Sequence, residues 1–266
     1  MNRACSVAEA AAPAKGTRPE GVTSEADASK KIREMFTEIA PSYDALNHLL
    51  SLQIDRVWRA RAARRLRPIL ARPDALVLDL CCGTGDLALA LRKSGKARVV
   101  GADFAHTMLV RARAKSIMGG SHSGMPGPPP LPLFEADALR LPFANASFDL
   151  VATAFGFRNL ANYESGLREM RRVLKPGGTA AILEFTEPPR GPFGALFNWY
   201  FRSVLSRIGG ALSGHRTAYT YLPKSVSRFF RPAQLASLMT EVGYQSVDFR
   251  VWTLGTVALH TGVKSN

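Results

Sequence analysis

Acidic residues and glycines gather in the stretch Leu76–Asp86, LVLDLCCGTGD, and their spacing indicates a site for a nucleotide-like ligand. Gly83 and Gly85 let the backbone turn sharply and approach a ligand closely where a strand passes into a helix. Asp79 and Asp86 place negative charge where a phosphate group would need neutral or positive neighbours. The expected ligand therefore lacks phosphates.

Further acids follow the next two apolar runs of the chain. Asp103 ends the run ARVVGAD, and its two carboxylate oxygens are suited to bind the vicinal hydroxyls of a ribose. Asp137 and Ala138 come directly after a short third run. We therefore expect both places to contribute to the same site as the glycine turn.

The elements that position these residues are strands alternating with helices, which predicts a doubly wound, Rossmann-like α/β fold with a parallel sheet. Expected strands are 76–80, 97–103, 133–136, 148–153 and 179–184, followed by two closing strands at 244–254 and 256–261. Expected helices run from residue 29 to Pro41 and over 55–70, 104–117, 162–174 and 228–243, with one more after the glycine turn. A turn is expected at 175–178.

One domain accounts for most of the chain. Residues 1–28 have almost no large apolar side chains and are predicted to be a disordered tail. Residues 29–266 are predicted to form a single domain, with N-terminal helices over 29–70 and an apolar, aromatic lid region over 193–226. The Gly/Pro-rich stretch 116–132 is predicted to be an exposed loop.

Charge and cysteine content narrow the function classes. The formal net charge is +14, which favours an anionic surface as a partner without saying which. Three cysteines, of which Cys81 and Cys82 are adjacent, form neither a disulfide framework nor a spaced set of metal ligands. The sequence contains no run of about 20 uninterrupted apolar residues, the length that would predict a membrane span. We expect no metal and a reducing compartment.

Four ordered motifs carry a family resemblance: YDALNHLLSLQIDRVW (43–58), DLCCGTGD (79–86), FGFRNL (155–160) and RRVLKPGGTAAILEFTEP (171–188). Together they resemble the demethylmenaquinone and polyprenyl-benzoquinol C-methyltransferases, class I S-adenosylmethionine-dependent enzymes of menaquinone and ubiquinone biosynthesis. The resemblance covers about residues 30–262. It implies S-adenosylmethionine as methyl donor and a prenylated quinol, with a naphthoquinol or a benzoquinol ring, as acceptor.

The sequence departs from the family pattern at several places. Leu46 and Asp55 replace a usual Met and His, and Ala154 stands where a Ser that contacts the donor is common, so that role is not assigned here. The loop 116–132 is also longer than the family pattern. None of these departures changes the glycine turn or Asp103.

Two sets of site residues are expected, and the set at the methyl acceptor is a hypothesis from the place of Arg158 and Asn159 after the fourth strand, where an open α/β sheet presents its substrate crevice. Arg158 is expected to lower the pKa of a phenol or water electrostatically, while Tyr43 and Asn159 orient the ring oxygens. Each has a structural alternative: an ion pair for Arg158, packing for Tyr43, a turn-fixing role for Asp79 and helix capping for Thr84. The arginines of helix 55–70 are expected to face solvent. Expected donor contacts are Asp79, Gly83, Thr84, Gly85, Asp103, Asp137 and Ala138.

A substrate with an isoprenoid tail also implies a place for the enzyme. We expect peripheral association with an anionic membrane, on the cytoplasmic side of an inner membrane or on the matrix side in a mitochondrion. A homodimer or a quinone-synthesis complex is a further expectation, and nucleic acid is not expected as a partner. Alternative functions are an RNA or other small-molecule methyltransferase, a scaffold subunit of such a complex, and a dehydrogenase using Gly83, Gly85 and Ala88 as G-x-G-x-x-A.

Overall fold

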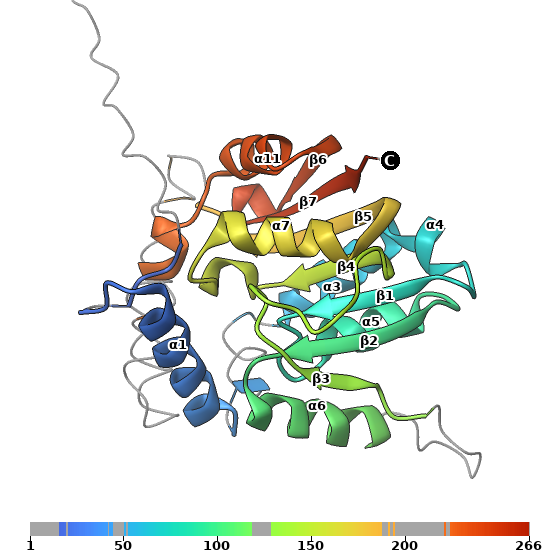
Figure 1. The fold of residues 1–266 in the computed structure, drawn as a ribbon, viewed down its shortest axis with the longest axis horizontal. Coiled ribbons are helices and arrows are strands. Elements are labelled where there is room, and N and C mark those ends of the chain that lie inside the picture. The colour runs from blue at the N-terminus through green and yellow to red at the C-terminus, as the bar shows by residue number, and fades with distance from the viewer. Residues whose placement is uncertain are drawn as a thin grey trace, which may run out of the picture.

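A seven-stranded sheet in the order β3-β2-β1-β4-β5-β7-β6 forms the centre of the protein, as the computed structural model shows (Figure 1). The structure describes residues 16–19, 21–41, 43–44, 51, 53–118, 129–187, 191, 194, 221 and 224–265. The strands are β1 (Leu76–Leu80), β2 (Arg98–Asp103), β3 (Leu133–Glu135), β4 (Phe148–Ala154), β5 (Leu174–Phe185), β6 (Tyr244–Trp252) and β7 (Val257–Lys264). The helices are α1 (Glu25–Ile39), α3 (Ile54–Arg65), α4 (Arg67–Leu70), α5 (Asp86–Lys93), α6 (His106–Met118), α7 (Tyr163–Val173) and α11 (Pro232–Glu241), with short 3-10 turns η1 (Phe157–Asn159) and η3 (Thr253–Gly255).

Helices cover both faces of the sheet because side chains of a strand alternate between its faces. Leu78 and Val151 pack in one core with residues of α7 and α11. Their neighbours Val77 and Leu150 pack in the opposite core with residues of α3 and α5. The expectation of a Rossmann-like α/β fold wound on both faces is therefore confirmed.

The sheet is parallel over five strands and antiparallel at one edge. β3, β2, β1, β4 and β5 pair in parallel, whereas β7 lies antiparallel between β5 and β6. The parallel sheet expected from the alternation of strands and helices is confirmed for the first five strands, and the sequence predicts no direction for the two closing strands. The chain returns from β6 to β7 through the short turn η3, which only an antiparallel pair permits, since a parallel crossover needs a dozen or more residues.

The N-terminal boundary also differs from the expected one. Helix α1 begins at Glu25, with the Ser24 hydroxyl accepting from the Asp27 N–H at 3.0 Å, rather than at residue 29. Upstream, the Thr17 N–H donates to the Leu160 carbonyl at 2.8 Å, and a Cβ on Gly16 would collide with the Ala161 carbonyl. Hydrogen bonds hold this strap, residues 16–19, in place of apolar burial, so composition alone did not reveal it. Residues 1–15 lie outside the described part.

Three element bounds differ for local reasons. Helix 55–70 divides into α3 and α4 near Leu66, since Pro68 in the first turn of α4 has no N–H to donate. The turn expected at 175–178 lies inside β5 as an irregularity in its pairing with β4, with Gly177 at φ +73°. Residues 224–228 form a helical turn of their own before α11 begins at Pro232. Most of the lid region 193–226, and 119–128 of the Gly/Pro loop, lie outside the described residues.

Candidate functional site at the carboxyl ends of the strands

The glycine turn connects β1 to α5 at one wall of a cavity. Gly83 and Gly85 have φ values of +54° and +84°, a region that L residues avoid, and Gly85 is the N-cap of α5. At Gly85 an added Cβ would lie 3.2 Å from the Ala112 side chain. Glycine is thus required at this position both for its backbone angle and for its space.

Asp79 serves the turn with one oxygen and faces the cavity with an unpartnered one. Its Oδ2 accepts the Ala88 N–H at 2.8 Å, which is the expected turn-fixing role. Its Oδ1 is buried and has no hydrogen-bond partner among the described residues, although the residue lines the cavity. Burial raises the pKa of Asp79 well above its ordinary range, and the Ala88 N–H lowers it less. Such an oxygen suits a positively charged ligand group that donates a hydrogen bond.

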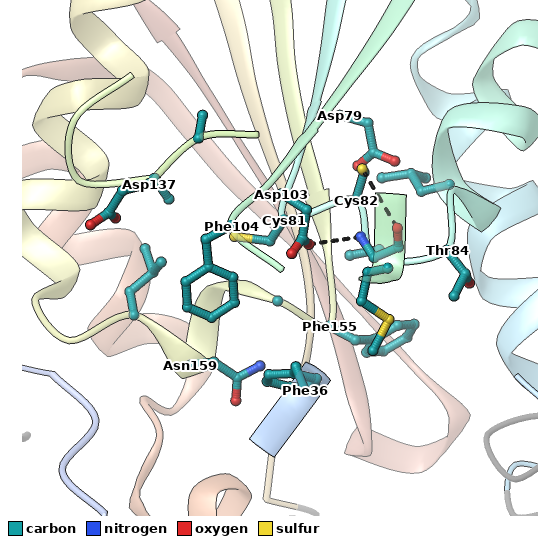
Figure 2. A pocket seen from close by; sticks show the side chains of 18 of the residues that line it. Phe36, Asp79, Cys81, Cys82, Thr84, Asp103, Phe104, Asp137, Phe155 and Asn159 are labelled. Carbon is teal, nitrogen blue, oxygen red and sulfur yellow. Dashed lines mark hydrogen bonds between the residues drawn. The ribbon is translucent and has the colours of Figure 1, made fainter. Parts of the chain in front are cut away.

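Asp103 lies opposite the turn at the end of β2, and Figure 2 shows its carboxylate pointing to the backbone of Gly83. Its Oδ2 accepts the Gly83 N–H at 2.8 Å and its Oδ1 the Ala105 N–H at 2.9 Å. Burial raises the pKa of Asp103 to about 6, against these backbone donors, which lower it. Each oxygen keeps a second lone pair for a ligand hydroxyl.

Asp137 and Ala138 line the cavity after β3, and Figure 2 shows Asp137 on the opposite side of the cavity from Thr84. One oxygen of Asp137 accepts the Leu139 N–H at 2.9 Å, and Ala138 is buried. Phe104 and Leu139 add apolar lining between them and Asp103. An aromatic base attached to a ribose would find apolar contacts and hydrogen-bond acceptors together here.

Thr84 belongs to a polar network that joins three separate parts of the chain. Its hydroxyl donates to Asp44 and accepts from the Lys115 ammonium at 3.0 Å. Lys115 also pairs with Asp44 at 2.6 Å and with Asp86 at 2.7 Å. Among the described residues the hydroxyl bonds to Asp44 and Lys115 and to no backbone N–H of α5, where Asp79 accepts the Ala88 N–H instead. Lys115 was not expected here, because its partners lie far away in sequence.

Of the three residues expected to act on the methyl acceptor, two line the same cavity. Tyr43 packs edge-on against Phe36 at 6.1 Å between ring centroids, and both rings line the cavity. Asn159, at the end of η1, is buried and accepts the Tyr221 hydroxyl at 3.0 Å with its Oδ1. Tyr221 therefore fixes the side chain of Asn159 beside the cavity.

Arg158 is not among the described residues that line that cavity, and its expected catalytic role stays a prediction. The guanidinium is buried, pairs with Glu184 at 2.9 Å and donates to the Phe155 carbonyl. Glu184 also accepts the backbone N–H of Arg158 at 3.1 Å. The carboxylate of Glu184 therefore holds both the guanidinium and the backbone of Arg158. The structural alternative, a buried ion pair, is the one that the geometry favours.

Other lining residues were interpreted differently or not singled out. Arg59, assigned to a solvent-facing row of arginines, lines the cavity with its side chain 11% exposed. Asp55, one helical turn earlier, is a buried acid that pairs with it, and this spacing was the available signal. Cys81 and Cys82 also line the cavity, and burial raises both thiol pKa values, which agrees with their expected lack of reactivity.

Comparison with known proteins decides the family. The model of the ubiE/COQ5 methyltransferase family matches residues 24–264. The chain belongs to this family. It is 47% identical to the demethylmenaquinone methyltransferase of Thermus thermophilus, over 86% of this chain and 99% of the relative. It is 45% identical to the enzyme of the same name from Deinococcus radiodurans, over 90% and 94%. A ubiquinone/menaquinone biosynthesis C-methyltransferase from Geotalea daltonii is 40% identical, over 88% and 97%.

Solved structures share the fold of this methyltransferase. A methyltransferase from Thermotoga maritima, described as S-adenosylmethionine-dependent, has a TM-score of 0.60 at 17% identity, over 87% of this chain and 99% of its own. Another, from Aquifex aeolicus, has a TM-score of 0.51 at 18% identity, over 76% and 89%. At these identities the likeness supports the fold alone.

The cavity fits S-adenosylmethionine, the methyl donor of this methyltransferase. The unpartnered oxygen of Asp79 suits the ammonium group, Asp103 suits the ribose hydroxyls, and Asp137 with Phe104 suits the base. The acids also complement a positively charged sulfonium. When bound, S-adenosylmethionine supplies an electrophilic methyl group, and the glycine turn with its acids holds it.

Proposed function

We propose that this methyltransferase methylates a ring carbon of a prenylated quinol, with demethylmenaquinol as the first acceptor to test. The observation that carries the proposal is the identity of 47% and 45% to two relatives named demethylmenaquinone methyltransferase, over almost their whole length. A benzoquinol is the second candidate, since the relative at 40% identity is named for both quinones.

Ring methylation requires a phenol to lose its proton, because the phenolate makes the ortho carbon nucleophilic. Tyr43 and Asn159 line the donor cavity and are the proposed partners of the ring oxygens. The Asn159 amide can donate to a phenolate while Tyr221 holds its oxygen at 3.0 Å. Positioning of two reactants supplies up to about 7–11 kcal/mol of a barrier, and a group that aids deprotonation adds about 10²- to 10⁴-fold.

Arg158 then contributes as a positioning residue. Its ion pair with Glu184 ties η1, which carries Asn159, to β5. We therefore expect Arg158→Lys, which keeps the charge and loses the planar donor set, to lower kcat while leaving the donor affinity unchanged. Loss of donor affinity in parallel with kcat would place Arg158 in the donor site instead.

The deciding experiment gives the purified protein a labelled methyl donor and one acceptor at a time. Demethylmenaquinol, a demethylated benzoquinol with the same tail, and RNA are the three acceptors, and mass spectrometry locates the methyl group. Transfer to the ring carbon of demethylmenaquinol supports the proposal. Transfer to the benzoquinol alone would make a benzoquinol, and not demethylmenaquinol, the substrate. Transfer to RNA refutes the proposal, and donor binding without any transfer supports a scaffold role.

Peripheral membrane association is a separate proposal. It is supported by the net charge of +14 and by the tail expected on the substrate. Among the described helices none is long and apolar enough to cross a bilayer. Flotation with vesicles of anionic and of neutral lipids at low salt tests it. Equal binding to both vesicle types, or to neither, would contradict an electrostatic attachment.

A further inference from the structure

The lining of the donor cavity combines several acids with one cation among its described residues. The cation is Arg59, and the acids are Asp79, Asp86, Asp103 and Asp137. S-adenosylmethionine carries a carboxylate as well as its two positive groups. Such an acidic lining repels a carboxylate unless a cation meets it directly.

Arg59 is held with its guanidinium at the cavity. Nη1 pairs with Asp55 and lies 3.6 Å from Asp86, at the first residue of α5. Its Cζ lies 5.6 Å from the centroid of the Phe155 ring, within the range of a cation–π contact. Asp55 is itself buried and accepts from the Ser51 hydroxyl at 2.6 Å. The guanidinium is thereby oriented before any ligand arrives.

Donor capacity remains on the same guanidinium. The recorded ion pairs both use Nη1, and within the described part of the chain Nε and Nη2 make no hydrogen bond. Arginine presents its five donors in a planar fork that matches a carboxylate. A second anion can therefore bind without displacing Asp55.

The neighbourhood of Arg59 matches an α-amino acid. Its positive charge acts on Asp79, whose Oδ1 is buried without a partner. The methionine part of the donor carries an ammonium and a carboxylate on one carbon, so that its site needs an acid and a base side by side. Asp79 of β1 and Arg59 of α3 both line the cavity and supply one group of each charge.

We infer that Arg59 binds the carboxylate of S-adenosylmethionine and selects the donor against its decarboxylated form. A purely structural alternative is that Arg59 only neutralises Asp55 and Asp86. The two differ in one measurable quantity, the ratio of the affinities for the two ligands. The inference concerns the donor alone and holds whatever the acceptor is.

The experiment is titration calorimetry of Arg59→Gln with S-adenosylmethionine and with decarboxylated S-adenosylmethionine, without any acceptor. A hydrogen-bonded charge pair predicts that Arg59→Gln weakens the native donor by roughly tenfold or more and the decarboxylated one by less than about threefold. Arg61→Gln, an exposed arginine on the same helix, is the matched control and should change neither affinity.

Equal weakening of both ligands, or of neither, would overturn the inference. If Arg59→Gln does not fold, as circular dichroism will show, Arg59→Lys decides by the same ratio. Lysine keeps the charge and loses the fork, so that we expect a partial loss of discrimination. A wild-type protein that binds the two ligands equally would overturn the inference without any variant.

Discussion

Binding of S-adenosylmethionine is expected to release protons from two buried carboxyl groups. Burial raises the pKa of Asp103 to about 6 and shifts that of Asp79 in the same direction. Near its pKa of about 6, Asp103 is partly protonated before the donor arrives, and a nearby positive charge favours the ionised form of both carboxyl groups. Protons therefore leave as the donor binds, and the donor affinity falls as the pH falls.

The magnitude follows from the linkage of proton and ligand binding. With a pKa of about 6, Asp103 is about half protonated at pH 6 and about one-tenth protonated at pH 7. Asp103 should release about 0.5 proton per bound donor at pH 6 and about 0.1 at pH 7. Well below pH 6, the Kd for the donor should rise by about tenfold for each pH unit by which the pH falls. Burial raises the pKa of Asp79 in the same direction, so that any proton it releases adds to that of Asp103.

Calorimetry in several buffers measures this release. The number of protons released is the slope of the observed binding enthalpy plotted against the ionisation enthalpy of the buffer. Work between about pH 6 and 7 keeps the donor's own ammonium charged, since an α-amino group titrates near pH 8. Asp103→Asn should lose its share of the slope at pH 6, and Asp74→Asn, an exposed acid, should not. A zero slope for the wild type at pH 6, or an unchanged slope in Asp103→Asn, would refute the reasoning.

Three further substitutions test the parts around the donor site. Glu184→Gln leaves the buried guanidinium of Arg158 unpaired and should lower the free energy of unfolding by about 3–5 kcal/mol, read by denaturant titration; a change below about 1 kcal/mol contradicts the ion-pair assignment. Thr17→Val keeps the shape of the strap but loses the hydroxyl, so that the free energy of unfolding should fall by about 1–3 kcal/mol and kcat should fall at an unchanged donor Kd. An unchanged kcat would show that the strap does not position Asn159. Gly85→Ala, at φ +84°, should lower the free energy of unfolding by about 1–2 kcal/mol and weaken donor binding in calorimetry. A stability and a donor affinity equal to those of the wild type would show that the turn relaxes.

Much of the fold was predictable because the patterns are local. β1 and β2 are short apolar runs, and an acid or a glycine marks where each of them ends, as at Asp103 and Gly83. The order of β6 and β7 was not predictable in this way. Antiparallel pairing of β7 with β5 joins Leu183 to Leu259, and no periodicity within either strand records that contact.

The donor half of the site was likewise predictable, since its residues stand in contiguous motifs. The misinterpreted residues depend on long-range contacts. Arg59 belongs to a row of arginines without helical periodicity, and Lys115 has partners 29 and 71 positions away in sequence. Thr17 contacts Arg158 at a separation of 141 residues. Composition gave the wrong answer for the strap because hydrogen bonds of Thr17 and Arg18, and not large apolar side chains, hold it in place.

The loop that follows β4 is where the two halves of the site meet. Its residues Phe155 and Gly156 line the donor cavity, and Asn159 carries the proposed contact to the methyl acceptor. The strap holds this loop from one side, where the Thr17 hydroxyl donates to the Arg158 carbonyl at 2.5 Å, and Glu184 holds it from the other. Both supports lie outside the donor cavity, so that their loss moves Asn159 without removing a donor contact. Selective loss of turnover after such substitutions is therefore the mark of the acceptor half, and joint loss of turnover and donor affinity is the mark of the donor half.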